Sequence, residues 1–432
     1  EGGLPLKCGQ RTATRTDTDN TGGMAGDIHS VFLSSTDDSD LVGGGLGVEG
    51  NLVSNGTFDT DISGVDDVSD AGGSVAWNSG LQAIDIINVT GNARGNINVP
   101  VVVGKFYAVS ISNVGIGSIS TYVDAVNQGT VDEGVVDRVT YVQATVNPMV
   151  VSVRNFDTGT TRTADDIQVW LVDEDRSVNA SHAIVMGTVT REPVADGAEL
   201  MGYAGWTNND KLRVADHGLN LGTGDFSVMG WFRNDGIGST AHIIGQENAA
   251  GDNSAFHMTR SSSSGDMNLN FSVAGNSVGG APAPVGEWAM FVGQRKGGVN
   301  EVYLNGAFIH SETTTAIDIT SAKDIVIGAK YSGGAQCRGD LALLRVSETA
   351  LTAAQIAKIY ADELTLFQPG AACTLAGADT EVKALANDPD LDLLHVGQSS
   401  GTSIFNGLAR ISENTNAVST TLDVVSGLVA GR

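Results

Sequence analysis

Residues 328–360 read GAKYSGGAQCRGDLALLRVSETALTAAQIAKIY and combine a glycine-rich turn, an alternating apolar run and the start of a helix. The run DLALLRV has the period of two that is typical of a β-strand. Thr352 follows with Gln355 three residues later, which is the spacing of a capping box at a helix N-terminus. We therefore expect one short helix near 352–362, soon after a strand, in a chain whose other elements are strands.

The composition indicates a β-protein with many tight turns. Glycine is abundant at 56 of 432 residues, and proline is scarce at 8. Val, Thr, Ser, Asn and Asp fill the spaces between short apolar runs, a pattern that favours antiparallel strands. The chain is also long for a single hydrophobic core, since domains commonly hold about 100–150 residues. We predict an all-β chain of two tandem antiparallel β-sandwiches, with short β-rich segments at both ends.

The charge and the cysteines exclude several classes of function. The formal net charge is −26, so the surface repels nucleic-acid phosphates, and we expect no nucleic-acid partner. No apolar run approaches the about 20 residues of a membrane helix, and we expect no membrane insertion. Cys8, Cys337 and Cys373 are odd in number and far apart, so we expect isolated thiols.

The first sandwich is expected over 49–178. It opens with NLVSNGTFD, which predicts a strand from Asn51 followed by an Asn-Gly turn at Asn55–Gly56, and it closes with IQVWLVD. These two ends resemble the jelly-roll carbohydrate-binding modules of glycanases, and the middle matches those modules in strand rhythm. The resemblance implies a two-sheet jelly roll. Alternating runs between the two ends predict its strands, at 83–89, 106–111, 139–146, 149–153 and 167–172.

The second sandwich is expected over 179–367. Phe226, Val228 and Phe232 share one face of a predicted strand, and the Asn305–Gly306 pair suits a type I′ hairpin turn. The succession DFSVMGWF, EWAMFVGQ, VYLNG, IVIGAKYSG and RGDLALLRVSETALTAAQIAKIY then resembles, in order, the concanavalin A-like lectin fold in its laminin G-like form. The resemblance implies an antiparallel sandwich that ends in the short helix.

We predict a structural role for that helix. Leu351 can contact Ile356 as a hydrophobic staple, and Ile356, Ile359 and Tyr360 recur at helical spacing. The resemblance places the helix after the last-but-one strand, where we expect it to seal an end or edge of the sandwich, because open edges invite unwanted strand pairing.

Two flanking segments remain. Residues 1–48 are polar, and we expect a β or irregular arm with one strand at 28–33. Residues 368–432 contain LLHVG and TSIFNGL, which predict one hairpin resembling part of a propeller blade; one copy is too few for a propeller. We expect this C-terminal hairpin to pair with another subunit, as an oligomerisation segment, or with a further segment.

No catalytic pattern stands out. Some concanavalin A-like folds are glycan hydrolases, which need two carboxylates roughly 5–10 Å apart. Their Glu-x-Asp-x-x-Glu pattern is absent: the strand after Trp231 offers Arg233 and Asn234, and 173–175 (DED) lies past a strand end. The seven histidines lack zinc-binding spacings. We predict that the protein is not an enzyme.

Asp340 is the metal candidate. It ends the tripeptide Arg338–Asp340, whose letters RGD we attribute to chance and not to receptor adhesion. In many concanavalin A-like domains an Asp at this point helps to hold a structural calcium, so the resemblance implies Asp340 as a ligand and calcium as a structural cofactor. The alternative is a carboxylate that caps a turn.

A sugar site needs an exposed aromatic ring with Asn, Asp or Gln nearby. Trp77, Tyr203, Trp206 and Tyr331 all lie beside turn residues and are the glycan-binding candidates. The alternative for each is ordinary packing. Trp231 and Trp288 lie within predicted strands and are expected in the core.

The order of the domains resembles tail-fibre and appendage proteins of tailed bacteriophages. The resemblance implies a virion structural protein, extracellular and homo-oligomeric, with other virion proteins and a host cell-surface glycan as partners. Repetition would raise the avidity of weak single sites. Two alternatives remain open: a secreted bacterial glycan-binding adhesin, and a polysaccharide depolymerase.

Overall fold

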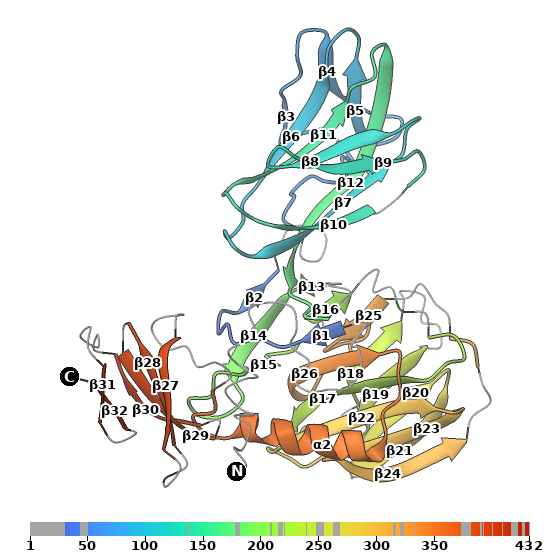
Figure 1. The fold of residues 1–432 in the computed structure, drawn as a ribbon. Coiled ribbons are helices and arrows are strands. Elements are labelled where there is room, and N and C mark those ends of the chain that lie inside the picture. Colours follow the sequence, from blue (N-terminus) through green and yellow to red (C-terminus); the bar gives the residue numbers. More distant parts are fainter. Residues whose placement is uncertain are drawn as a thin grey trace.

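The protein consists of two stacked β-sandwiches and a smaller C-terminal sheet beside the second sandwich (Figure 1). No helix among the described residues is long and apolar enough to cross a membrane. The structure is a computed structural model that describes residues 31–43, 51–135, 138–177, 182–207, 210–214, 219, 221–238, 240–247, 255–261, 268–313, 317–319, 324–331, 333–372, 382–388, 391, 393–399, 401–407, 409–415, 422–425 and 428–431.

The first sandwich packs a five-stranded antiparallel sheet against a second layer. The five-stranded sheet has the order β3 (Val65–Asp67), β6 (Ala93–Val99), β11 (Met149–Asn155), β8 (Ile119–Val123) and β9 (Val126–Val131). The other layer has the order β4 (Gly73–Asn78), β5 (Ala83–Asn88), β12 (Thr160–Asp173), β7 (Phe106–Asn113) and β10 (Arg138–Gln143).

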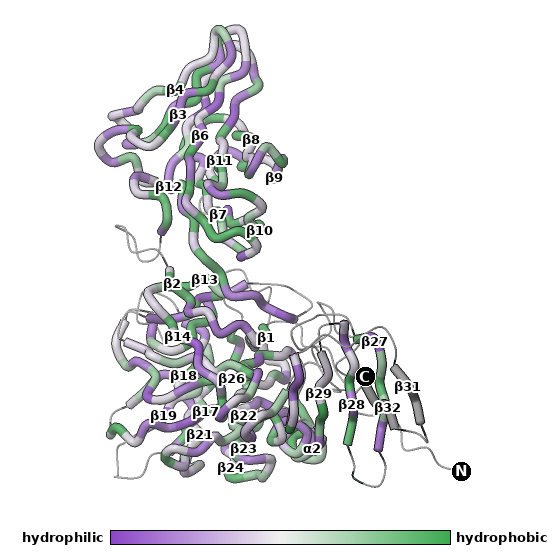
Figure 2. Tube along the Cα trace, turned by 90° about the vertical axis from the view of Figure 1, so that its left-hand side faces the viewer, coloured by the Kyte–Doolittle hydropathy of each residue, from purple (hydrophilic) through white to green (hydrophobic). Residues whose placement is uncertain are grey.

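Alternation of side chains along these strands builds the core. In β6 the residues Ala93, Ile97 and Val99 are buried in the core between the two layers, and Arg94, Asn96 and Asn98, which alternate with the buried positions, point outward. Figure 2 shows the same alternation of hydrophobic and hydrophilic residues along this part of the chain. A period of two with one buried face is the signature of a sandwich strand, so the predicted alternating runs are strands.

The segment 51–53, predicted as a strand, is not one. The side-chain Oδ1 of Asn51 accepts hydrogen bonds from the backbone N–H of Val53 at 3.0 Å and of Val169 at 2.9 Å. The Asn51 side chain therefore forms the hydrogen bonds that strand pairing would otherwise provide, and it holds this segment against β12.

The second sandwich consists of a nine-stranded sheet and the remaining strands of a twelve-stranded sheet. The latter part has the order β13 (Ala183–Met186), β16 (Lys211–Val214), β25 (Asp324–Ile327), β18 (Ala241–Glu247), β19 (Phe256–Ser261), β20 (Asn268–Val273) and β21 (Asn276–Pro282). The nine-stranded sheet has the order β2 (Leu41–Val42), β14 (Thr188–Pro193), β15 (Met201–Ala204), β26 (Gly339–Ser347), β17 (Phe226–Asn234), β22 (Trp288–Lys296), β23 (Val299–Leu304) and β24 (Ala307–Thr313), and β1 (Val31–Leu33) also pairs with β26.

The two sandwiches share one continuous strand connection. The end of β12 pairs with β13, where Val172 lies opposite Ile184. The N-terminal arm contributes β1 and β2 to the nine-stranded sheet, so its described part belongs to the second sandwich. Of the predicted strand at 28–33, residues 31–33 form β1, and residues 28–30 lie outside the described residues. The predicted all-β class with two antiparallel sandwiches is confirmed.

The predicted helix is present as α2 (Ala353–Glu363), and a 3-10 turn, η1 (Leu364–Phe367), follows it. Both bonds of the Thr352–Gln355 capping box form. The helix was predicted to seal an end or edge of the sandwich, but its main contacts are with a sheet face. It covers the outer face of the nine-stranded sheet, where Ile356 joins a cluster with Trp231, and the Trp231 ring stacks on Phe367 at 4.1 Å between centroids. Aromatic residues on that face need cover from water, which explains the position.

The C-terminal segment forms more than the predicted single hairpin. Its sheet is a four-stranded antiparallel meander of β27 (Val382–Asp388), β28 (Leu393–Gln398), β29 (Gly401–Asn406) and β30 (Ala409–Asn414). A separate two-stranded sheet comprises β31 (Leu422–Val425) and β32 (Leu428–Gly431). Its pairing with another subunit stays a prediction.

Candidate functional site

Two of the four predicted aromatic platforms lie in the core. Tyr203 is 0% and Trp206 is 7% exposed. The Tyr203 hydroxyl donates to the Asp173 carboxylate at 2.6 Å, and the Trp206 indole N–H donates to the Tyr203 carbonyl at 3.2 Å. Their polar atoms are thus satisfied inside the protein, as buried tyrosines and tryptophans require. The prediction that these two rings are exposed for sugar stacking is wrong.

The other two candidates lie far apart in the fold. Trp77 is 39% exposed on the edge strand β4, and its indole N–H donates to the Phe58 carbonyl at 2.9 Å. Tyr331 is half-buried in the turn after β25, with the Arg213 guanidinium 5.7 Å from its ring centroid. The first belongs to the first sandwich and the second to the second sandwich, so they do not form one site.

Asp340 is engaged by a cation of the protein. Nε of Arg233 donates a hydrogen bond to Oδ2 of Asp340 at 2.6 Å, and Nη2 forms an ion pair with the same oxygen at 2.5 Å. Burial raises the pKa of Asp340, and Arg233 opposes that rise. In the described part of the chain no three His, Cys, Asp or Glu side chains gather to hold a metal. These surroundings do not fit a calcium ion, which needs six or more oxygen ligands.

Of the three cysteines, Cys337 alone lies in the described part of the chain, and there it joins no metal-binding group. Cys337 is a buried free thiol whose pKa burial raises well above its usual value. Cys8 and Cys373 lie outside the described residues.

The outer face of the five-stranded sheet carries a row of polar side chains that crosses all five strands. Asp66, Asn96, Ser152, Tyr122 and Asn127 are successive cross-strand partners from β3 to β9. In β6, β11 and β8 they alternate with the core residues Ile97, Val151, Val153 and Val123, so they lie on the side away from the core. Ser152 is only 1% exposed. We name this row, together with Arg94, Asn98, Arg154 and Phe156 beside it, the polar sheet face.

Hydrogen bonds order one end of the polar sheet face. The Asn98 amide donates to the Asp66 carboxylate at 2.8 Å, and the Ser152 hydroxyl donates to Oδ1 of Asn96. Amide and carboxylate groups fixed on neighbouring strands can exchange hydrogen bonds with the hydroxyl groups of a sugar. Strands also position such groups more rigidly than loops do.

An aromatic and arginine cluster lies on the other side of the row. The Tyr122 and Phe156 rings meet edge to face at 6.2 Å between centroids, and Phe156 is 45% exposed. The Arg154 guanidinium carbon lies 3.8 Å from the Tyr122 ring centroid. Burial lowers the pKa of Arg154, and the nearby Arg94 cation lowers it further, while Tyr122 opposes the change. An exposed ring beside fixed polar groups is the arrangement that a sugar needs.

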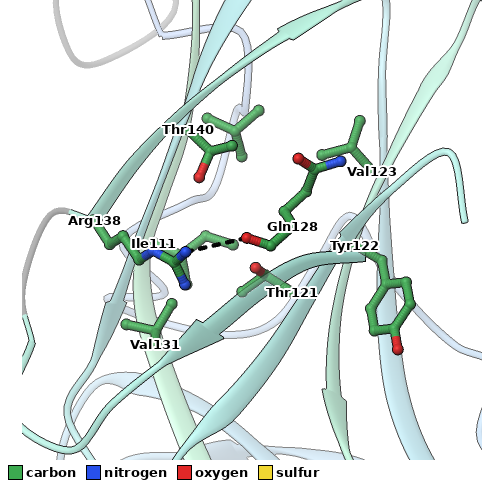
Figure 3. Close-up of a pocket in the computed structure, with 9 residues that line it drawn as sticks. Ile111, Thr121, Tyr122, Val123, Gln128, Val131, Arg138 and Thr140 are labelled. Atoms are coloured by element: carbon green, nitrogen blue, oxygen red, sulfur yellow. Dashed lines mark hydrogen bonds between the residues drawn. The ribbon is translucent and has the colours of Figure 1, made fainter. Parts of the chain in front are cut away.

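A hollow in the first sandwich is lined by residues of β7, β8, β9 and β10 (Figure 3). It holds about 260 Å³ of empty space, open solvent included. Arg138 closes it by donating to the carbonyls of Thr130 and, at 3.1 Å, Gln128. The Tyr122 ring points away from the hollow in Figure 3 and belongs to the outer face. The hollow is thus a small gap between sheets, bridged by an arginine.

Sequence reasoning missed Tyr122 and Phe156. Both lie within or just after alternating runs, TYVD and VRNFD, where an aromatic residue is as compatible with the core as with the surface. Alternation separates the two faces of a strand but does not show which face is buried. In β11 the packed sheets place Val151 and Val153 in the core, and this identifies the opposite face as the outer one. The cross-strand register that gathers the row is not visible in one sequence.

Residues 207–357 match the family model described as the concanavalin A-like lectin/glucanases superfamily. The match lies within the second sandwich and confirms its predicted concanavalin A-like, laminin G-type fold. No curated protein matches the chain.

Solved structures resemble parts of the chain. A pentraxin from Limulus polyphemus is 20% identical, with a TM-score of 0.28 over 32% of this chain and 69% of that one. The receptor-binding domain of botulinum neurotoxin C/D mosaic serotype is 14% identical, with a TM-score of 0.36 over 56% of this chain and 61% of the domain. Domain 4 of the Geobacillus stearothermophilus arabinanase AbnA, solved with arabinotriose, is 20% identical, with a TM-score of 0.32 over 40% of this chain and 82% of that domain. Likenesses this low carry no inference about function.

Proposed function

We propose that the protein is a non-enzymatic glycan-binding protein and that the polar sheet face binds the sugar. The observation that carries this proposal is the row from Asp66 to Asn127, which crosses five strands and includes Tyr122, whose ring meets the exposed Phe156 ring edge to face. The lectin-type fold of residues 207–357 supports a glycan-binding role for the chain.

The physical basis is complementarity to a pyranose ring. The C–H face of a sugar packs on an aromatic ring, and its hydroxyl groups exchange hydrogen bonds with amides and carboxylates. Phe156 supplies the ring, while Asp66, Asn96 and Asn98 supply fixed polar atoms. A row across five strands at about 4.8 Å per strand is roughly 19 Å long, which matches several sugar units, so the ligand is a polysaccharide chain.

The biological setting is a tail fibre or appendage of a bacteriophage particle. In this setting the protein is an extracellular, homo-oligomeric virion component that contacts a host cell-surface glycan and other virion proteins. The domain order described above supports it, and avidity from repeated copies would compensate for a weak single site. Finding the chain in purified particles by mass spectrometry tests this setting; finding it anchored to a bacterial cell wall instead would favour a secreted adhesin.

The proposed site is tested with Phe156→Ala on a polysaccharide array followed by titration. Aromatic pairs contribute about 0.5–1.5 kcal/mol beyond their buried area, and about 1.4 kcal/mol is a factor of ten in Kd. We expect a loss of about ten-fold or more.

The matched control is Phe308→Ala. Phe308 is 52% exposed on the edge strand β24 of the second sandwich, and we expect its removal to leave Kd unchanged. Equal loss in both variants, or loss in Phe308→Ala alone, would contradict the proposed site. Appearance of reducing ends during incubation with the bound polysaccharide would show a depolymerase and overturn the non-enzymatic role.

A further inference from the structure

We propose that the glycan bound by the polar sheet face is acidic and that Arg154 binds its carboxylate. This inference rests on the proposed function and specifies its ligand class: a polysaccharide that contains hexuronic or nonulosonic acids. Arg154 lies on β11, two residues from Ser152 of the polar row and two from Phe156.

Arg154 differs from the other cations of the first sandwich in its partners. Each of the others in residues 51–177 has a polar partner: Lys105 with Asp37, Arg94 with Asp70 and the Val68 carbonyl, Arg138 with the Thr130 and Gln128 carbonyls, Arg162 with Asp157, and Arg176 with Ser34. Among the described residues Arg154 has the Tyr122 ring as its contact and no polar partner. Its buried Nε is unpaired, as is that of Arg162, but Arg162 has Asp157 as a partner for its Nη2.

The register places a second cation directly opposite. Arg94 on β6 is the cross-strand partner of Arg154, and like charges opposite each other on neighbouring strands destabilise a sheet. Asp70 offsets Arg94 only in part, since its carboxylate lies 3.7 Å from the guanidinium and the two side chains are 38% and 52% exposed. An anion bound between the two strands would relieve this repulsion, so the arrangement favours a negatively charged ligand.

The geometry of the cation suits a carboxylate. A guanidinium is a planar fork that binds a carboxylate through two parallel hydrogen bonds. The Tyr122 ring holds one face of this fork at 3.8 Å from its centroid, which reduces the rotamer freedom lost when an anion binds. The exposed Phe156 ring meets the same Tyr122 ring edge to face, so one sugar unit can stack on Phe156 while its carboxylate meets Arg154.

The charge of the whole chain makes this local site selective. A net charge of −26 repels polyanions over most of the surface. An acidic polysaccharide is therefore bound only where paired arginines face it, and non-specific binding of the same polymer elsewhere on the protein is suppressed.

The test uses the full chain with polygalacturonate, hyaluronan and polysialic acid, each paired with its carboxyl-reduced neutral form, and with dextran sulfate. We expect at least one acidic polymer to bind ten-fold or more tightly than its reduced form. Arg154→Gln should abolish that difference, and Arg154→Lys, which keeps the charge but loses the fork, should retain part of it. Lys358→Gln, which removes a charge from an exposed helix side chain, is the matched control and should change nothing.

The outcomes separate this inference from the proposed function. Neutral polysaccharides that bind with dependence on Phe156, without preference for acidic forms, would overturn only the acidic ligand. An acidic preference that survives in a folded Arg154→Gln protein, or binding of dextran sulfate alone, would also overturn it. Absence of binding to every acidic and neutral polymer would overturn both. A thermal melt of each variant confirms that the loss is not one of folding.

Discussion

Replacing Trp206 with alanine should destabilise the second sandwich and not simply remove a sugar contact. The ring is 7% exposed, and it belongs to the main core cluster of that sandwich. Truncating a buried Trp to Ala lowers the free energy of unfolding by about 3–5 kcal/mol, because hydrophobic transfer energy is lost and a cavity is left behind. We expect a loss in this range in the free energy of unfolding, which is a large part of the stability of a typical domain.

Gly328, which packs against the Trp206 ring, offers a second and independent substitution. Gly328 has φ of +88°, and a Cβ placed there would lie 2.1 Å from the Trp206 ring. Gly328→Ala combines an unfavourable backbone conformation with a steric overlap, and we expect a loss of about 2–4 kcal/mol. Trp206→Phe, which keeps a ring but loses the bond to the Tyr203 carbonyl, should cost less, about 1–2 kcal/mol.

The assay is urea denaturation of the three variants, followed by far-UV circular dichroism and by glycan titration at a temperature where all remain folded. Trp77→Ala, at a 39% exposed position in the first sandwich, is the control and should leave the transition of the second sandwich in place. A Trp206→Ala protein with unchanged stability and no glycan binding would refute the assignment of Trp206 to the core and restore it as a sugar platform.

The remaining predictions concern a helix cap and a buried carboxylate. Thr352→Ala removes the hydroxyl that accepts from the Gln355 N–H and should lower the free energy of unfolding by about 1 kcal/mol; no change in urea midpoint would show that the cap is dispensable. Burial raises the pKa of Asp165 from 3.8 to about 6, and the charges of Asp166 and Asp59 add to this rise. Because the folded chain binds this proton more tightly than the unfolded chain, its contribution to stability falls as pH rises from about 4 to about 6. Asp165→Asn should therefore stabilise the protein at pH 7 by on the order of 1 kcal/mol, a figure discounted because the side chain is partly exposed. At pH 3.5 the substitution should have little effect on stability. An equal effect at both pH values would contradict burial of the charged carboxylate as the cause.

Much of the second sandwich could be predicted because its signals are local. The Thr352–Gln355 capping box needs three residues of sequence to be read, and the Asn305–Gly306 turn has both residues at positive φ, as a type I′ turn requires. Alternation in DFSVMGWF identified a strand for the same reason. These features depend on neighbours in the chain and not on tertiary contacts.

The position of the helix and the site depended on contacts distant in sequence. The capping box predicts where α2 begins, but its position over Trp231 depends on an apolar outer face that β17 and β22 build together. Tyr203 and Trp206 lie beside turns, and turns are usually exposed. Tyr203 is nevertheless buried, and its hydroxyl donates to the carboxylate of Asp173, 30 residues earlier in the chain.

The polar sheet face was not predictable for the same reason. Its residues lie between Asp66 and Phe156 in the chain, and the row across the five strands is aligned only by the pairing register. A shift of one residue in any strand would turn its contribution into the core.

The most direct test of the account is hydrogen–deuterium exchange of the full chain with and without a bound polysaccharide from the array. We predict that added protection appears in peptides covering β8 and β11, which carry Tyr122 and Arg154, and not in peptides around Trp77 or Tyr331. Protection confined to either of those two regions, with β8 and β11 unchanged, would contradict the claim that the polar sheet face binds the glycan.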